Sequence, residues 1–182
     1  EQTFGSVIGE PAKPSRIGYT FEGWFADKLY TKVWDFSKNV ILDDTTLYAK
    51  WTVNEYSVTL DPQGGSGGTG VITVGYGVAM PSAIAPTRSG YVFTGYFDEK
   101  DGKGTAYYSD SMKSLKPLDK TEPVKLYANW VSLKSVNFDS NGGSSIDPIY
   151  NIIPGSSIAE PAIPYKAGSA FEGWYKDSGT SI

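Results

Sequence analysis

The stretch that decides the fold is GYTFEGWF at residues 18–25, because the chain repeats it twice. It returns as GYVFTGYF at residues 90–97 and as GSAFEGWY at residues 168–175. The first residues of each copy alternate, so aromatic side chains two apart share one face of a predicted strand. The internal glycine predicts a bulge, or a close approach of another backbone where a Cβ would collide. A motif that returns at this spacing indicates a tandem array of small modules.

A second motif closes the copies. The run LYAKW at residues 47–51 returns as LYANW at residues 126–130. In both runs the leucine, the alanine and the tryptophan are expected on one face of the strand. The tyrosine and the fourth residue, Lys50 or Asn129, are expected on the other face. Equivalent endings therefore predict equivalent last strands in the two copies.

These paired ends divide the chain into three repeats. Repeat 1 (residues 1–51) lacks its first hairpin, repeat 2 (52–133) is complete and carries short linkers, and repeat 3 (134–182) is truncated. The chain begins in the middle of a repeat, so we expect it to be a piece of a longer protein. The positions that carry the structural repeat are Gly18, Tyr19, Phe21, Gly23, Trp24, Trp51, Gly90, Tyr91, Phe93, Gly95, Tyr96, Trp130, Gly168, Phe171, Gly173 and Trp174.

The composition predicts a mainly β or α+β protein. Twenty-one Gly and eleven Pro fall at regular places between apolar runs, as expected for short strands and turns. Residues 32–36 alternate like a half-buried strand. Each copy also has a crossover with a proline at an equivalent place, at Pro14, Pro86 and Pro164. Because proline fixes φ and blocks regular pairing, either an extended segment or one short helical turn fits the crossover.

Missing residue types exclude several kinds of chemistry. The chain has no Cys and no His, so disulfides, Cys–His nucleophiles and Ser–His–Asp triads are impossible and the usual zinc ligands are lacking. The net charge is −4 and no basic cluster occurs, which argues against nucleic-acid binding. No apolar run approaches the ~18 residues that a membrane span requires.

Three patterns resemble functional motifs. Residues 65–70 read G-x-G-x-x-G, but a β run follows where a dinucleotide site needs a helix, so we predict a hairpin loop. The acidic turn at residues 98–102 lacks the ligand spacing of a calcium loop, so we interpret its carboxylates as solvated. Glu22 and Glu172 recur once per copy, and a neutral threonine replaces them in repeat 2, which disfavours a catalytic acid. We therefore predict no catalytic residue, no cofactor and no metal.

Exposed aromatic residues leave a binding role open. Tyr48, Tyr127 and some of the pair Tyr107 and Tyr108 are expected on the face opposite the tryptophans. There they could stack on a sugar or anchor a protein partner. The alternative is that these amphipathic side chains cover the core of a small β module.

The order of these motifs resembles the Listeria–Bacteroides repeat, the B-repeat module of internalin B and of many bacterial surface proteins. The matching stretches include residues 136–143, 18–24 and 46–51, and the resemblance covers essentially the whole chain. The departures are Tyr96 in place of Trp and Ser169 in place of Tyr. The resemblance implies tandem β-grasp-like modules with mostly antiparallel sheets wrapped over the crossover. Composition alone also allows an immunoglobulin-like sandwich.

The resemblance also implies a function. It suggests a non-catalytic tandem-repeat region of a bacterial cell-surface protein, located outside the cell and acting as the stalk or spacer of an adhesin. A host protein or glycan is the expected partner, and a protein- or glycan-binding module that uses exposed aromatics is the alternative. The incomplete terminal repeats present unpaired strand edges, so self-association is a further expectation.

Overall fold

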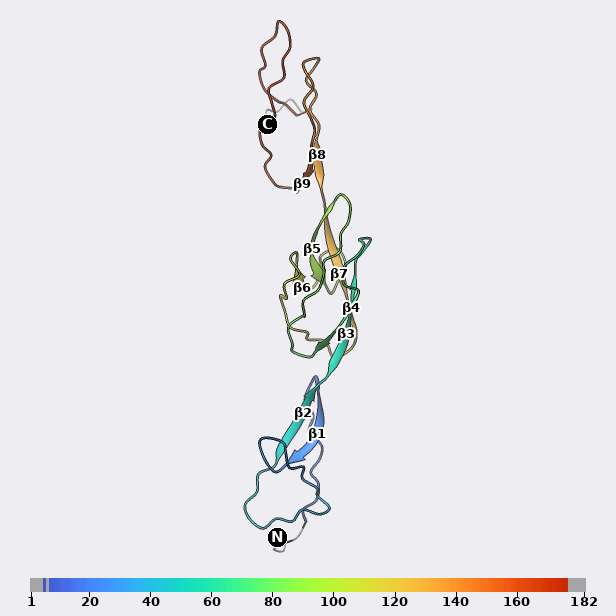
Figure 1. The fold of residues 1–182 in the computed structure, drawn as a ribbon, viewed down its shortest axis with the longest axis vertical. Coiled ribbons are helices and arrows are strands. Elements are labelled where there is room, and N and C mark those ends of the chain that lie inside the picture. Colours follow the sequence, from blue (N-terminus) through green and yellow to red (C-terminus); the bar gives the residue numbers. More distant parts are fainter. Residues whose placement is uncertain (1–4, 6, 177–182) are drawn as a thin grey trace.

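The structure is a computed structural model that describes residue 5 and residues 7–176. Within that part of the chain there are nine strands and no helix, which confirms a mainly β protein with mostly antiparallel sheets. The sheets follow one another along the long axis of the molecule (Figure 1). The strands are β1 (Tyr19–Phe25), β2 (Tyr48–Val53), β3 (Glu55–Asp61), β4 (Val71–Gly75), β5 (Tyr91–Phe97), β6 (Ala106–Ser109), β7 (Val124–Ser132), β8 (Lys134–Val136) and β9 (Ile149–Ile152).

Repeat 2 contains the largest sheet, with the strand order β4-β3-β7-β5-β6. Neighbouring strands pair antiparallel, except that β3 and β7 are parallel. The first and last strands of the repeat therefore lie side by side inside the sheet. β3 and β7 thus form a central parallel pair, with β4 beside β3 and with β5 and then β6 beside β7.

The crossover that joins β4 to β5 is extended. Two isolated antiparallel bridges hold it, one between Ser66 and Thr87 and one between Ala79 and Pro117. Met80 buries its side chain in the core, with 5% of its surface exposed. Of the two conformations that fitted the prolines, repeat 2 thus adopts the extended one, in which a residue without a backbone N–H is tolerated.

The glycine inside the repeated motif lies at a β-bulge, as predicted. The register between β5 and β7 shifts between Phe93 and Gly95, and the same shift occurs in β1 between Phe21 and Gly23. Gly95 has a φ of +133°, and a Cβ at this position would collide with the backbone oxygen of Tyr108 on β6. The motif therefore needs glycine both for its dihedral angle and for the close approach of the neighbouring strand.

The core is concentrated in repeat 2. Outside this repeat, the only fully buried apolar side chain among the described residues is Phe25. The central parallel strands β3 and β7 contribute alternate residues to a single cluster, as expected for a sheet with one covered face. Its buried members are Val58, Leu60, Val74, Met80, Phe93, Tyr96, Tyr107, Tyr108, Met112, Leu118, Leu126 and Ala128.

Repeat 1 joins repeat 2 without a flexible linker. β2 ends at residue 53 and β3 begins at residue 55, so only Asn54 lies between them. The Asn54 N–H donates to the Gly18 oxygen at 2.9 Å, and its carbonyl accepts from the Tyr76 N–H at 2.9 Å. The Thr20 hydroxyl donates to the Asn54 side chain at 2.6 Å, and the Tyr76 ring meets the Tyr19 ring edge-on at 6.5 Å. Both backbone hydrogen bonds and side-chain contacts therefore hold repeat 1 against repeat 2 at this junction.

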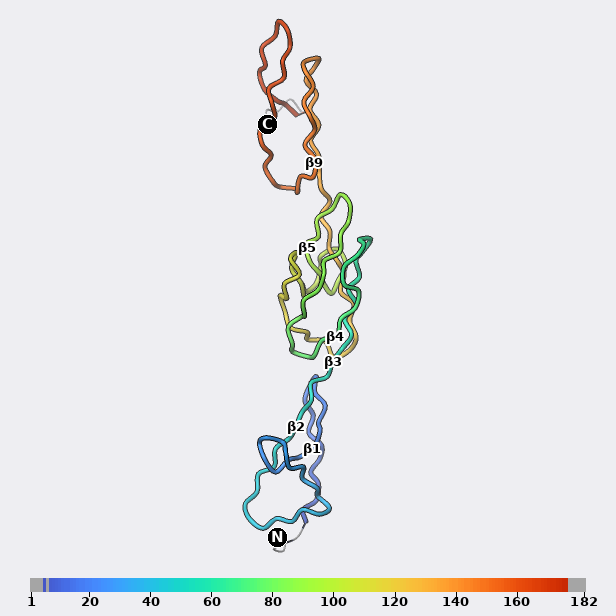
Figure 2. Tube along the Cα trace, in the orientation of Figure 1, coloured from blue at the N-terminus to red at the C-terminus, as the bar shows by residue number. Residues whose placement is uncertain are grey.

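The connection from repeat 2 to repeat 3 follows the same plan. β7 ends at residue 132 and β8 begins at residue 134, and the Leu133 N–H donates to the Gly90 oxygen at 2.9 Å. The short linkers expected at the two ends of repeat 2 are therefore mostly strand residues, since only Asn54 and Leu133 lie between strands. Figure 2 shows the chain passing from each repeat directly into the next.

The strand expected at residues 32–36 does not form. Only Val33 pairs, in an isolated bridge with Phe25. The reason is a turn directly after it, because the Asp35 carboxylate accepts the Ser37 N–H at 2.9 Å and the Asn39 side chain accepts the Asp35 N–H at 2.7 Å. Side chains of this kind compete with a strand ladder for the backbone.

Candidate functional site

Three aromatic residues of the motifs form a cluster in repeat 2. The Phe93 ring contacts Tyr96 and Trp130 edge-to-face, with centroids 5.3 and 5.5 Å apart. The indole N–H of Trp130 donates to the Pro62 oxygen at 2.9 Å. A Cβ on Gly65 would lie only 2.5 Å from the same indole ring. The loop after β3 therefore closes tightly over Trp130, and the cluster is a packing site.

The other repeats contain the same aromatic contacts. In repeat 1 the Phe21 ring lies 5.5 Å from Trp24 and 5.4 Å from Trp51, and in repeat 3 the Phe171 ring lies 5.3 Å from Trp174. The indole nitrogens of Trp24 and Trp174 are buried and have no hydrogen-bond partner among the described residues. In repeat 2 the corresponding residue is a tyrosine, the departure noted in the sequence.

The first glycine of each motif adopts a left-handed backbone, with φ of +75° at Gly18, +76° at Gly90 and +72° at Gly168. Two residues before this glycine, an arginine covers the motif tyrosine in the first two repeats. The Arg16 guanidinium lies 3.7 Å from the Tyr19 ring centroid, and Arg88 lies 3.9 Å from the Tyr91 centroid. Repeat 3 has lysine and serine at these places and cannot form this pair.

Both terminal repeats contain a hollow beside their aromatic residues. In repeat 1 a hollow of about 710 Å³ is lined by Trp24, Trp34 and Ile8 among others. In repeat 3 a hollow of about 340 Å³ is lined by residues including Phe171 and Trp174. The self-association expected from the sequence stays a prediction.

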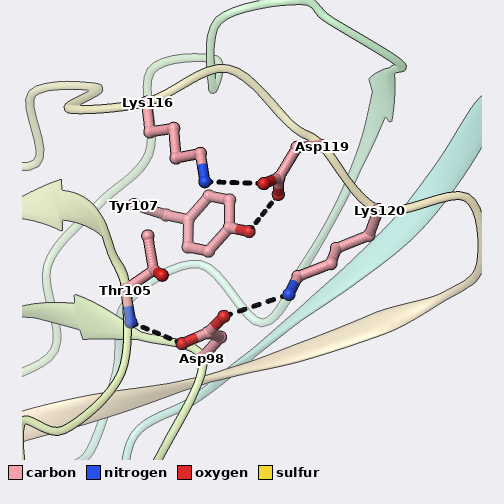
Figure 3. A network of polar contacts seen from close by, with 6 residues as sticks. All are labelled: Asp98, Thr105, Tyr107, Lys116, Asp119 and Lys120. Atoms are coloured by element: carbon pink, nitrogen blue, oxygen red, sulfur yellow. Dashed lines mark hydrogen bonds and ion pairs between the residues drawn. The ribbon is translucent and has the colours of Figure 1, made fainter.

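Asp98 belongs to a polar network at one end of the repeat 2 sheet (Figure 3). Its carboxylate accepts the Thr105 N–H at 2.6 Å and pairs with the Lys120 ammonium at 3.1 Å. Burial opposes the ionised form, but the Thr105 N–H and Lys120 outweigh it, so the pKa of Asp98 lies below its usual value. Only 16% of this side chain is exposed, so the interpretation of Asp98 as a solvated turn carboxylate is wrong.

Asp119 forms the second half of the network. Its carboxylate pairs with the Lys116 ammonium at 2.6 Å and accepts a hydrogen bond from the Tyr107 hydroxyl (Figure 3). The bonds from Lys116 and Tyr107 lower the pKa of Asp119. The network therefore ties the segment after β6 to the sheet through two carboxylates whose lowered pKa values keep them ionised at neutral pH.

We expect Asp98→Asn to destabilise repeat 2 by about 1–2 kcal/mol, because it weakens two hydrogen bonds to an ionised carboxylate. The matched variant is Asp101→Asn in the same turn, where the side chain is exposed and asparagine tolerates the φ of +60°. It should change stability by no more than about 0.5 kcal/mol. Urea unfolding with and without calcium measures both effects. A calcium-dependent stabilisation that both variants abolish would contradict this assignment.

Two of the tyrosines considered for binding are unavailable. Tyr107 and Tyr108 are both completely buried, although neighbouring strand residues normally face opposite sides. The Tyr108 hydroxyl donates to the Pro81 oxygen at 2.5 Å, which fixes its ring against the crossover. Of the two alternatives, covering the core is the correct one for this pair.

Tyr48 and Tyr127 remain accessible in part and occupy equivalent places. A lysine from the turn after the motif lies over each ring, with the Lys28 nitrogen 5.8 Å from the Tyr48 centroid and the Lys100 nitrogen 5.7 Å from the Tyr127 centroid. The two pairs therefore repeat along the array with the period of the modules. Of the four tyrosines considered for binding, these two are the ones that a sugar or protein partner could reach.

The glycine-rich run at residues 65–70 is a hairpin loop, as predicted, since it joins the antiparallel strands β3 and β4. Its backbone is packed against the crossover, because a Cβ on Gly68 would lie 2.9 Å from the Pro86 nitrogen. In the described part of the chain, no group of three or more acidic side chains is placed to hold a metal ion.

Sequence reasoning did not identify the polar network. Lys116, Asp119 and Lys120 lie between β6 and β7 and include an i, i+3 pair of opposite charges. The i, i+3 spacing of Lys116 and Asp119 is the sequence signal that could have identified this ion pair. The pairing of Lys120 with Asp98 spans 22 positions and had no local signature.

Comparison with known proteins gives a consistent result. A family model described as the Listeria-Bacteroides repeat domain matches residues 1–50, 56–129 and 135–182. The chain is 35% identical over 97% of its length to a protein of Evansella cellulosilytica named as a Gly-rich membrane protein, and 35% identical over 96% of its length to another named as a membrane protein. It is 39% identical to Internalin H of Listeria monocytogenes over 53% of its length.

The chain spans only part of these relatives, namely 20%, 25% and 17% of their respective lengths. No solved structure is similar to it at a significant level. No helix in the described residues is both long and apolar enough to cross a bilayer.

Proposed function

Because the chain belongs to the Listeria–Bacteroides repeat domain family, we propose that it is a non-catalytic spacer in a bacterial cell-surface protein of the adhesin type. The repeats hold a recognition region away from the cell envelope, outside the cell. Partners such as a host protein or glycan are engaged elsewhere in the parent protein or along the array itself.

The observation that carries this proposal is the continuity of strands between repeats. A single residue separates β2 from β3, and a single residue separates β7 from β8. Hydrogen bonds from Asn54 and Leu133 anchor these residues to the repeat that precedes each junction. Junctions of this kind restrict bending, because a backbone hydrogen bond to the preceding repeat holds the residue between the strands. A spacer needs this property, whereas an enzyme does not.

Small-angle X-ray scattering of the full chain tests the spacer. We expect the scattering of a stiff rod, and we expect Tyr76→Ala to increase flexibility because it removes the Tyr19 contact at the first junction. A matched substitution at the exposed Tyr150 should leave the scattering unchanged. Scattering typical of freely jointed beads for the unmodified chain would contradict the proposal.

Antibody labelling of intact bacterial cells that express the parent protein tests the location. Labelling should occur without permeabilisation of the envelope. Labelling that requires permeabilisation would contradict a surface location.

A ligand-binding module is the alternative, and the repeated Lys28–Tyr48 and Lys100–Tyr127 pairs favour it. A tyrosine ring beside an ammonium group offers both a stacking face and a hydrogen-bond donor, which suits a sugar. In that case the intact chain binds glycans or host proteins, and Tyr48→Ala with Tyr127→Ala abolishes the binding.

A further inference from the structure

The two ends of repeat 2 leave through neighbouring strands. β3 continues from repeat 1, and β7 continues into repeat 3. These strands are parallel and share four residue pairs in register, from Val58 opposite Val124 to Asp61 opposite Tyr127. Figure 1 shows both strands running along the long axis of the array.

This arrangement determines how the repeat responds to tension. When the array is stretched, β3 is pulled towards its N-terminal end and β7 towards its C-terminal end. Two parallel strands pulled in opposite directions slide past each other, so the hydrogen bonds between them are loaded together and not one after another. Each hydrogen bond is weak by itself, and simultaneous rupture raises the barrier.

The strand pair is also protected from water and reinforced. Val58 and Leu126 are completely buried and Leu60 is 2% exposed, so the face of the pair that points into the core is dry. Water therefore has poor access to the hydrogen bonds between these strands. Beyond the paired residues, the indole of Trp130 on β7 holds the oxygen of Pro62, the residue that follows β3.

On each outer side a further strand supports the pair. β4 pairs with β3 over five positions from Glu55 to Thr59, and β5 pairs with β7 from Tyr91 to Phe97. Neither β3 nor β7 is an edge strand, so neither can be peeled from the sheet without breaking pairing on two sides.

We propose that the parallel β3–β7 pair is a mechanical clamp that carries tension along the array. The inference depends on the proposed spacer function in one respect, namely that the array is pulled along its length from its two ends. A protein that holds a recognition region on a cell surface is pulled at its two ends, and this pair lies directly between the two ends of the repeat.

Single-molecule stretching of the full chain with two choices of attachment point tests the clamp. The chain has no Cys, so each introduced thiol is unique. Glu55→Cys with Lys134→Cys loads β3 and β7 in shear, whereas Glu55→Cys with Glu122→Cys pulls both strands from the same end and unzips them. All three positions are exposed, and urea unfolding checks that both variants keep the stability of the unmodified chain.

We expect the shear geometry to need at least roughly twice the unfolding force of the unzipping geometry, since forced unfolding follows the height of the barrier. The event is identified in shear by the extended length of the chain between the two thiols, about 26–28 nm. The gain in length is this value less the separation of the two thiols in the folded repeat. Equal forces in the two geometries would overturn the proposal.

Trp130→Phe provides a second measurement. It keeps an aromatic ring but removes the hydrogen bond to Pro62. We expect it to lower the force in shear and to leave the unzipping force unchanged, because unzipping begins at the opposite end of the strands. An equal reduction in both geometries would refute the reinforcing role of Trp130. Equal forces in a stiff, surface-exposed array refute the clamp alone, whereas a flexible or intracellular array refutes the spacer.

Discussion

We expect repeat 2 to unfold cooperatively as the pH rises above about 10, where tyrosine normally ionises. Burial raises the pKa of Tyr96 to about 12, with a further contribution from the negative charge of Asp61. Burial also raises the pKa of Tyr108 to about 12. The pKa of Tyr107 is raised by burial and by its hydrogen bond to Asp119.

The sign of the effect follows from these raised values. A group with a higher pKa in the folded state than in the unfolded state stabilises the fold fully below the unfolded pKa. That contribution is lost as the pH rises from 10 towards the folded pKa. A shift of two units corresponds to about 3 kcal/mol for each of Tyr96 and Tyr108. A domain of this size has only roughly 5–10 kcal/mol of stability, so the loss is enough to unfold it.

The measurement combines tyrosinate absorbance at 295 nm with circular dichroism during an alkaline titration. The three buried tyrosines, Tyr96, Tyr107 and Tyr108, should ionise only with the unfolding step. Tyr108→Phe removes one of the buried groups that ionise, so this variant should unfold at a higher pH than its free energy of unfolding at neutral pH would otherwise predict. Tyr150→Phe should leave the pH of unfolding unchanged. Ionisation of all thirteen tyrosines in one step near pH 10, without loss of structure, would contradict the burial of these three.

The sequence predicted local structure correctly at positions where the backbone geometry allows few residue types. The motif glycine predicted the bulge at Gly95, because a left-handed dihedral and a close backbone leave no alternative. The glycine-rich run at residues 65–70 predicted a hairpin loop, because the β run after it excluded a helix. The equivalent prolines limited the crossover to two conformations, and packing against the core selected the extended one.

Other features depend on contacts between distant residues and have no local signal. Alternation placed Tyr107 and Tyr108 on opposite faces, yet both rings are buried, and Lys116 from the segment after β6 lies over the Tyr107 ring. Tyr107 then finds its partner in Asp119, within the same segment. The carboxylate of Asp98 was judged by its turn, whereas its environment is set by Lys120 from another part of the chain.

The parallel pairing of β3 with β7 shows the same limit. The residue patterns of β3 and of β7 are each compatible with an antiparallel partner. Only the complete sheet order shows that these two strands are neighbours. In this fold the property most relevant to a spacer therefore comes from topology, while the individual motifs account for packing within each repeat.

We expect Trp130→Ala to destabilise repeat 2 by about 3–5 kcal/mol, which is typical of removing a large aromatic side chain from a packed site. The substitution removes the contact with Phe93 and leaves the Pro62 oxygen without its donor. It also opens a cavity beneath Gly65, whose backbone packs directly on the indole. Phe93→Ala should have an effect of similar size, because it removes the ring that contacts both Tyr96 and Trp130.

The array supplies a matched control for this prediction. Trp51 occupies the equivalent place in repeat 1 and contacts Phe21 at 5.4 Å, nearly the distance between Trp130 and Phe93. In the described part of repeat 1, however, only Phe25 is a fully buried apolar residue, so little core depends on Trp51. Trp51→Ala should change the free energy of unfolding, measured from the main urea transition, by less than about 0.5 kcal/mol. If both alanine variants shifted that transition equally, the cooperative unit would be the whole array, and the concentration of stability in repeat 2 would be refuted.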